Sequence, residues 1–241
     1  YAVYNFIDTL VLAQLNQFIN MTFIVAIQLK DSIVVAVDNK HLLLKDKKLD
    51  EYHEYVDSKL YAWHSGIITG TGEHYVIDKA IRLFINNVDS DLEKLPTCLN
   101  ISRQIREMEV GYHEQIQSSK LLYSNYSENG AKLFAVEPTE ELGIYQTTEF
   151  KENDLIIWLV NPNIQSISEN LKSLYANSRP QTSFNRVEDW IDYYISAIAE
   201  IYAKQSDIDS WMSRSFDIFL QTKDHYFYKH IENIAIPLPV G

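Results

Sequence analysis

Two apolar, β-branched runs near the start of the sequence constrain its fold more than any other feature. TFIVAIQL (residues 22–29) and SIVVAVD (residues 32–38) are separated only by the polar pair Lys30-Asp31. Valine and isoleucine favour extended backbone, and a short polar break between two such runs is typical of a β-hairpin. We therefore expect a hairpin of buried strands, joined by a turn of two residues or slightly more.

The rest of the sequence arranges strands and helices in blocks. A polar stretch, expected as a loop or ribbon, fills residues 39–58. Strand patterns cover 59–72, 119–138, 141–162 and 215–231, and helical periodicity covers 73–87, 97–119, 164–176 and 187–205. Because helices do not alternate singly with strands, a doubly wound parallel fold is disfavoured. The order predicts an α+β fold: a four-layer αββα sandwich of two antiparallel sheets flanked by helix pairs, formed as one domain by residues 22–241.

Composition excludes several classes of protein. The net charge is −12, with 33 acidic against 21 basic residues, which argues against a nucleic-acid-binding surface. A single cysteine, Cys98, excludes an intrachain disulfide and a multi-cysteine zinc site, and it suits a reducing compartment. The longest apolar stretch, residues 10–15, is too short to cross a bilayer. We expect a soluble, cytoplasmic chain with no membrane partner, no metal and no organic cofactor.

Residues 1–21 have only a loose helical pattern. They lack the basic start and small-residue cleavage site of a signal peptide. We expect them to be an N-terminal extension, either a propeptide or sequence translated upstream of the true start.

Thr22, which follows Met21 directly ahead of the first strand, is the candidate nucleophile. The hydroxyl of an N-terminal threonine can attack a carbonyl carbon while the α-amine of the same residue accepts the proton. Nucleophile and base then come from one residue. Removal of Met21, or processing at the same bond, would expose Thr22.

Two charged residues and a glycine turn complete the candidate site. Asp38 lies sixteen residues after Thr22, at the end of the returning strand, so the hairpin should bring it beside the start of the first strand. Lys59 opens the next strand and can supply a cation that lowers the pKa of the hydroxyl. The chain has seven glycines, three of which fall in 66–72. The turn at Gly70 to Gly72 can offer backbone N–H groups to an oxyanion.

The segment TFIVAIQLKDSIVVAVD resembles the opening of proteasome β-type subunits and their HslV-like bacterial relatives, within the N-terminal nucleophile (Ntn) hydrolases. The Thr-to-Asp spacing, the strand-opening lysine and the glycine-containing turn before a helix match that family's pattern. LLYSNYSENGAKLFAVEP and DIDSWMSRSFDIFLQTKDHYFYKHI resemble its middle and last hairpins. The resemblance covers most of 22–232 and is specific over the first seventeen of those residues.

The resemblance implies a threonine-type peptidase acting on peptides or unfolded protein inside a homo-oligomeric ring, with any ATPase partner unknown. Thr22 would be the nucleophile, Asp38 and Lys59 the activating pair, and Gly72 or its neighbours the oxyanion hole. Asp209 would orient the amine of Thr22.

Departures from the family pattern keep two alternatives open. Met212-Ser213-Arg214 stands where the family has Ser-Gly-Gly, residues 161–163 (Asn-Pro-Asn) stand where it has Ser-Gly-Ser, and Gly72-Glu73 replaces Gly-Gly. Lys59 lies a few residues further from Thr22 than usual. The first alternative is a catalytically inactive ring or scaffold subunit, and the second is an Ntn amidohydrolase that acts on a small amide.

Overall fold

A computed structural model describes residues 22–45, 48–128, 130–140, 144–159 and 163–234. Within these ranges, only the backbone is described for residues 42–53. The extension expected at residues 1–21 lies outside this range, so it stays a prediction. Among the described residues, no helix is both long and apolar enough to span a membrane.

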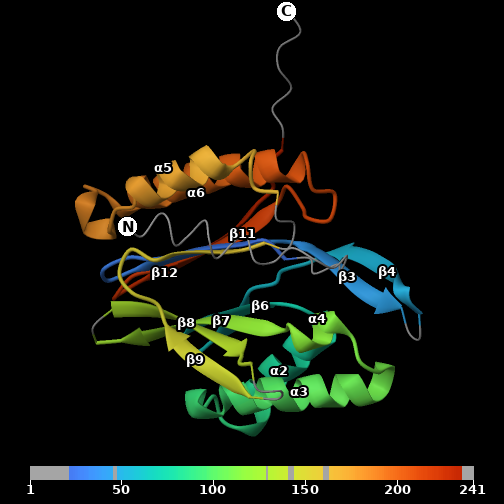
Figure 1. Cartoon of the computed structure of the whole chain (residues 1–241). Coiled ribbons are helices and arrows are strands. Elements are labelled where there is room, and N and C mark those ends of the chain that lie inside the picture. Colours follow the sequence, from blue (N-terminus) through green and yellow to red (C-terminus); the bar gives the residue numbers. More distant parts are fainter. Residues whose placement is uncertain (1–21, 46–47, 129, 141–143, 160–162, 235–241) are drawn as a thin grey trace, which may run out of the picture.

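The described strands form two five-stranded antiparallel sheets and a two-stranded ribbon. The first sheet has the order β10-β1-β2-β11-β12, from Leu155–Trp158, Ile24–Gln28, Ile33–Asp38, Phe216–Gln221 and Tyr226–Ile231. The second has the order β5-β6-β7-β8-β9, from Tyr61–Trp63, Gly66–Thr71, Lys120–Ser127, Gly130–Pro138 and Tyr145–Glu149. The ribbon pairs β3 (Lys40–Lys45) with β4 (Lys48–Val56) and extends from the edge of the layers (Figure 1).

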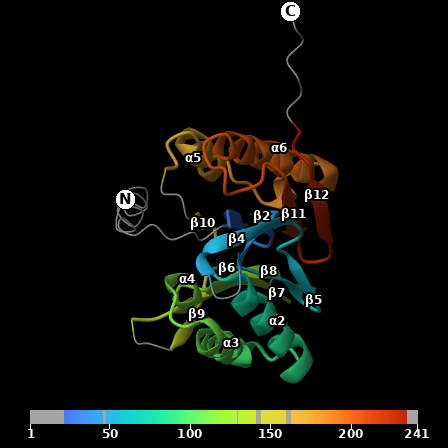
Figure 2. The same ribbon diagram turned by 90° about the vertical axis from the view of Figure 1, so that its right-hand side faces the viewer.

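Helices cover the outer face of each sheet, which completes four layers (Figures 1 and 2). Helices α5 (Ser168–Ala176) and α6 (Val187–Ser206) lie on the first sheet, and α2 (His74–Asn87) and α3 (Leu95–Val110) lie on the second. One apolar cluster fills each sheet–helix interface, and a third, including Val35, Leu122 and Leu133, fills the space between the sheets. The predicted αββα sandwich is confirmed.

The opening hairpin forms because every residue of β1 and β2 is buried, on one face by helices and on the other by the second sheet. Burying a side chain of this size contributes about 1.5–3 kcal/mol. The Leu29 N–H donates to the Ser32 carbonyl at 2.8 Å, which leaves Lys30 and Asp31 as the two residues of the turn. Ile24 pairs with Val37, which places Asp38 beside the residues that precede β1.

Two local predictions are wrong. The helix expected over 97–119 ends at Val110, because Gly111 adopts φ +88° and the short helix α4 (Glu114–Gln117) follows. Pro96 lies in the first turn of α3, a position where its missing N–H leaves no intrahelical bond unmade. Gly66 and Gly70 lie within strand β6, so Gly72 is the glycine of the 66–72 cluster that occupies the turn.

Candidate active site

The carboxylate of Asp38 connects the end of β2 to the start of β1. Asp38 is fully buried, and its Oδ1 accepts the backbone N–H of Phe23 at 2.8 Å. Its Oδ2 accepts the backbone N–H of Lys40 at 3.0 Å. The peptide group directly after Thr22 is therefore held by the carboxylate that the hairpin returns to it.

Lys59 forms a buried ion pair with the same carboxylate. Its Nζ lies 2.9 Å from Oδ1 and 3.1 Å from Oδ2 of Asp38. The lysine side chain is 7% exposed and that of Asp38 is 0% exposed. Burial lowers the pKa of Lys59, and the adjacent Asp38 opposes this by favouring the charged ammonium. A buried, well-bonded carboxylate thus places a cation near the start of β1.

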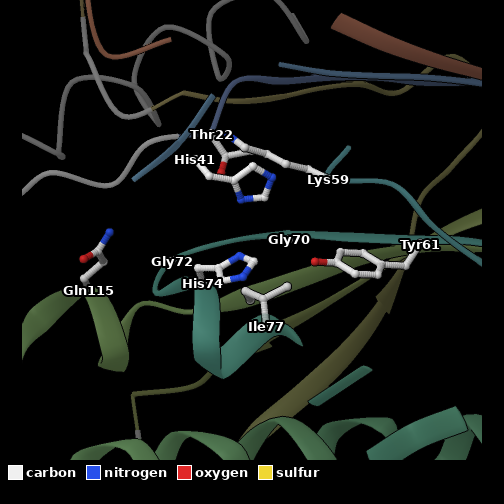
Figure 3. Close-up of a pocket in the computed structure, with 9 residues that line it drawn as sticks. All are labelled: Thr22, His41, Lys59, Tyr61, Gly70, Gly72, His74, Ile77 and Gln115. Carbon is white, nitrogen blue, oxygen red and sulfur yellow. The ribbon is translucent and has the colours of Figure 1, made fainter. Parts of the chain in front are cut away.

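Thr22 and Lys59 line one small cavity (Figure 3). Figure 3 shows Thr22, His41 and Lys59 on one side of it and Gly72, His74 and Ile77 on the other. The volume is ≈ 30 Å³, which is room for about two water molecules. A hydroxyl next to a buried ammonium loses its proton more easily, because the cation stabilises the developing alkoxide. The arrangement can therefore activate Thr22 as a nucleophile.

Gly72 forms the turn between β6 and α2 on the opposite side of the cavity from Thr22. Its φ of +119° lies in the region that side chains disfavour, and a Cβ placed on it would overlap Ser119. The side chain of the next residue, Glu73, caps α2 by accepting the Val76 N–H at 3.0 Å. A turn that opens a helix directs backbone N–H groups outward, which suits a developing negative charge.

Replacing Gly72 with alanine is expected to destabilise the fold more than the same change at Gly111. Both glycines have positive φ, so each alanine carries about 1–3 kcal/mol of backbone strain. A Cβ at Gly111 meets open space in the described part of the chain, whereas one at Gly72 adds an overlap of about 1–3 kcal/mol. Urea unfolding of the two variants measures the difference. Equal losses of unfolding free energy would show that Ser119 moves aside at no cost, and would contradict this prediction.

Asp209, expected to orient the amine of Thr22, is buried in the loop after α6. Its Oδ1 accepts the Trp211 N–H at 3.0 Å, and its own N–H donates to Gln205. Among the contacts of the described residues, none joins Asp209 to Thr22. Its role there stays a prediction.

Ser213 contacts the residue that follows Asp38, and the sequence did not predict this contact. Its hydroxyl accepts the Asn39 N–H at 2.7 Å and donates to the Ser215 carbonyl at 2.7 Å. The loop after α6 is thereby attached to the residue that follows Asp38. Ser213 lies within the triplet that departs from the family pattern, so spacing alone gave no signal for it.

A cluster of three rings beside the cavity was also missed. His41 stacks on Tyr55 with ring centroids 4.6 Å apart, and it meets His74 edge-on at 4.9 Å. The Tyr55 hydroxyl lies 3.2 Å from Nε2 of His74. Burial, followed by Lys59 and His74, lowers the pKa of His41 to about 4, and burial also lowers the pKa of His74. Both imidazoles are therefore neutral at pH 7, and the wall of the cavity that they form carries no charge.

His41 is expected to titrate with a midpoint near 4. The unfolded chain takes up this proton near pH 6.5, before the folded chain does. The contribution of His41 to stability is thus complete above pH 6.5 and falls as the pH drops toward 4, by at most about 3 kcal/mol. NMR titration of the imidazole signal, assigned with His41→Gln, measures the midpoint. A midpoint at or above 6.5 would contradict a buried imidazole beside Lys59.

The described residues contain no group of three histidine, cysteine, aspartate or glutamate side chains placed to hold a metal ion. The functional groups that meet at the cavity are instead a hydroxyl, an ammonium–carboxylate pair and a glycine turn.

The four-layer arrangement and sheet order define an Ntn-hydrolase fold. Known structures support this. Anbu (ancestral beta-subunit) from Yersinia bercovieri superposes with a TM-score of 0.58 at 10% identity, over 86% of each chain. Anbu from Hyphomicrobium sp. strain MC1 superposes with a TM-score of 0.55 at 11% identity, over 87% of each chain. The chain in the helical assembly of the Anbu complex from Pseudomonas aeruginosa superposes with a TM-score of 0.58 at 11% identity, over 87% of this chain and 86% of that one.

No protein-family model matches the sequence, and no curated protein does. The family assignment to proteasome β-type or HslV-like subunits is wrong: the similar structures are Anbu proteins, a distinct family with a proteasome-like fold. The hairpin segment and its Thr-to-Asp spacing therefore did not identify the family. At 10–12% identity the likeness establishes the fold alone.

Proposed function

We propose that this chain is a threonine-type amide hydrolase that cleaves peptide bonds with Thr22 as its N-terminal nucleophile. The observation that carries the proposal is the fully buried Asp38, which binds both Lys59 and the N–H of the residue after Thr22. Burying two charges is costly unless each is well bonded. A pair kept at this cost beside a hydroxyl and a cavity supports a catalytic role.

The mechanism is acyl transfer in two steps. The Thr22 hydroxyl attacks the amide carbon, its proton passes to the α-amine of Thr22, and the Gly72 N–H donates to the oxyanion. The leaving amine departs with that proton, which leaves an ester on Thr22. Water then hydrolyses the ester and restores the hydroxyl. Lys59 lowers the pKa of the hydroxyl throughout, and Asp209 orients the amine. No cofactor takes part in either step.

The mechanism requires that Thr22 become the first residue. We propose that residues 1–21 are separated from 22–241, the hydrolase domain, by methionine removal or processing at the bond after Met21. We also propose that this chain is cytoplasmic and that its copies assemble with one another. The helical assembly of the Anbu complex from Pseudomonas aeruginosa, which has a similar fold, supports the assembly.

A non-catalytic scaffold subunit is the second candidate. It is favoured by Asp209, whose carboxylate binds the Trp211 N–H and has no described contact with Thr22. Two assays distinguish the candidates: the hydrolysis of fluorogenic peptide amides and the hydrolysis of small amides, each by a chain that begins at Thr22. Turnover of the peptides supports the first, and turnover of small amides alone narrows it to a small-molecule amidohydrolase. Turnover of neither supports the scaffold.

A further inference from the structure

A buried ion pair lies directly behind the turn that carries Gly72. Glu73 is 1% exposed and Arg106, on α3, is 6% exposed. Nη2 of Arg106 lies 3.3 Å from Oε1 of Glu73, and the guanidinium packs over the Tyr75 ring at 4.5 Å. The arginine thus contacts two residues at the start of α2, Glu73 through charge and Tyr75 through stacking.

Glu73 is held from several directions at once. Its Oε2 accepts the Val76 N–H at 3.0 Å, and its own N–H donates to the Ser119 hydroxyl at 3.1 Å and to the Gln115 carbonyl at 3.2 Å. Ser119 in turn donates to Gln115 at 3.0 Å. Glu73 is therefore attached to α2, α3 and the segment around α4.

Burial of Glu73 disfavours its charged form. Burial raises the pKa of Glu73, and Arg106 is the largest influence that opposes it. A helix cap needs no such partner, because an exposed Asp or Ser caps a helix equally well. The guanidinium, 3.3 Å from Oε1, favours the carboxylate form of Glu73 and contacts it one residue after Gly72.

We infer that the Arg106–Glu73 pair positions the Gly72 turn, so that its N–H group is oriented before a substrate binds. This inference rests on the proposed function. Arg106 is a positioning residue, because it acts on Gly72 through Glu73. Preorganised donors stabilise an oxyanion without having to reorient during the reaction. Here Glu73, in place of a second glycine, makes the turn rigid.

The test uses the scarcity of glycine in this chain. With seven glycines in all, selective ¹⁵N-glycine labelling gives a spectrum in which the Gly72 amide can be followed alone. Arg106→Met is expected to shift the Gly72 signal and accelerate its hydrogen exchange, while the signals of Gly66 and Gly130 stay in place. In turnover assays kcat should fall by about tenfold or more, with KM within about twofold, because the lost orientation affects the transition state.

Arg103→Met is the matched control. Arg103 lies on the same helix, is 5% exposed and pairs with Glu107 at 2.8 Å, and no contact joins it to Glu73 among the described residues. It should leave the Gly72 signal unchanged. A second variant, Glu73→Gln with Arg106→Met, removes both charges and so avoids leaving one buried and unpaired. It is expected to fold and still to show the Gly72 shift.

An unchanged Gly72 signal in the double variant, or an equal shift in Arg103→Met, overturns the inference. Failure of the unsubstituted protein to hydrolyse any amide refutes the proposed function instead. The Gly72 signal then still decides whether Arg106 positions the turn.

Discussion

Replacing Thr22 with alanine is expected to abolish amide hydrolysis, lowering the turnover rate by at least about 1,000-fold. The hydroxyl is the nucleophile that attacks the amide, and alanine removes this hydroxyl while it keeps the α-amine. Thr22 is 8% exposed, so alanine leaves a small cavity and the fold should persist. Turnover of a fluorogenic peptide amide by both proteins, each beginning at residue 22, measures the effect.

Thr22→Ser is the matched control for this result. Serine retains a hydroxyl and an α-amine, so a measurable fraction of the activity should remain. Hydrolysis by Thr22→Ala at the unsubstituted rate, with unfolding curves that match, would place the nucleophile elsewhere and contradict the proposal.

Replacing Lys59 with methionine is expected to lower the free energy of unfolding by about 3–5 kcal/mol. Methionine fills most of the lysine volume but leaves the Asp38 carboxylate buried without its cation. Hydrolysis should also be lost, because nothing then lowers the pKa of the Thr22 hydroxyl. Chemical denaturation measures the first effect and turnover measures the second.

Lys94→Met is the control for the loss of an ion pair. Lys94 lies 3.2 Å from Asp91, with both side chains largely exposed, and pairs of this kind contribute about 0–1 kcal/mol. If the two substitutions cost equally little, the Lys59–Asp38 pair would not be the buried, closely bonded pair on which the site depends.

The fold could be predicted because its strongest signals are local. The β-branched runs of 22–38 identify the central hairpin, and the order of strand and helix blocks identifies the four layers. Positive φ at Gly111 was not visible, because glycine permits that conformation without requiring it. The predicted helix over 97–119 was therefore too long at its C-terminal end.

The candidate site was predictable only where residues lie close along the hairpin. Strand pairing fixes Asp38 against Phe23, so spacing was enough to place it. The contacts of Ser213 with Asn39 and of Arg106 with Glu73 join segments that are distant in the sequence, and no short motif encodes them. The rings of His41, Tyr55 and His74 meet because the base of the ribbon lies against the start of α2, which periodicity does not specify.

The central claim, that Thr22 acts as an N-terminal nucleophile, is tested most directly by mapping a covalent adduct on the natural protein. The probe is a peptide electrophile that bonds to both the hydroxyl and the α-amine of an N-terminal threonine. Peptide mass spectrometry is expected to find the adduct on a peptide that begins at Thr22. A natural chain that continues upstream of Thr22, or a chain that begins at Thr22 and carries no adduct there, would contradict the claim.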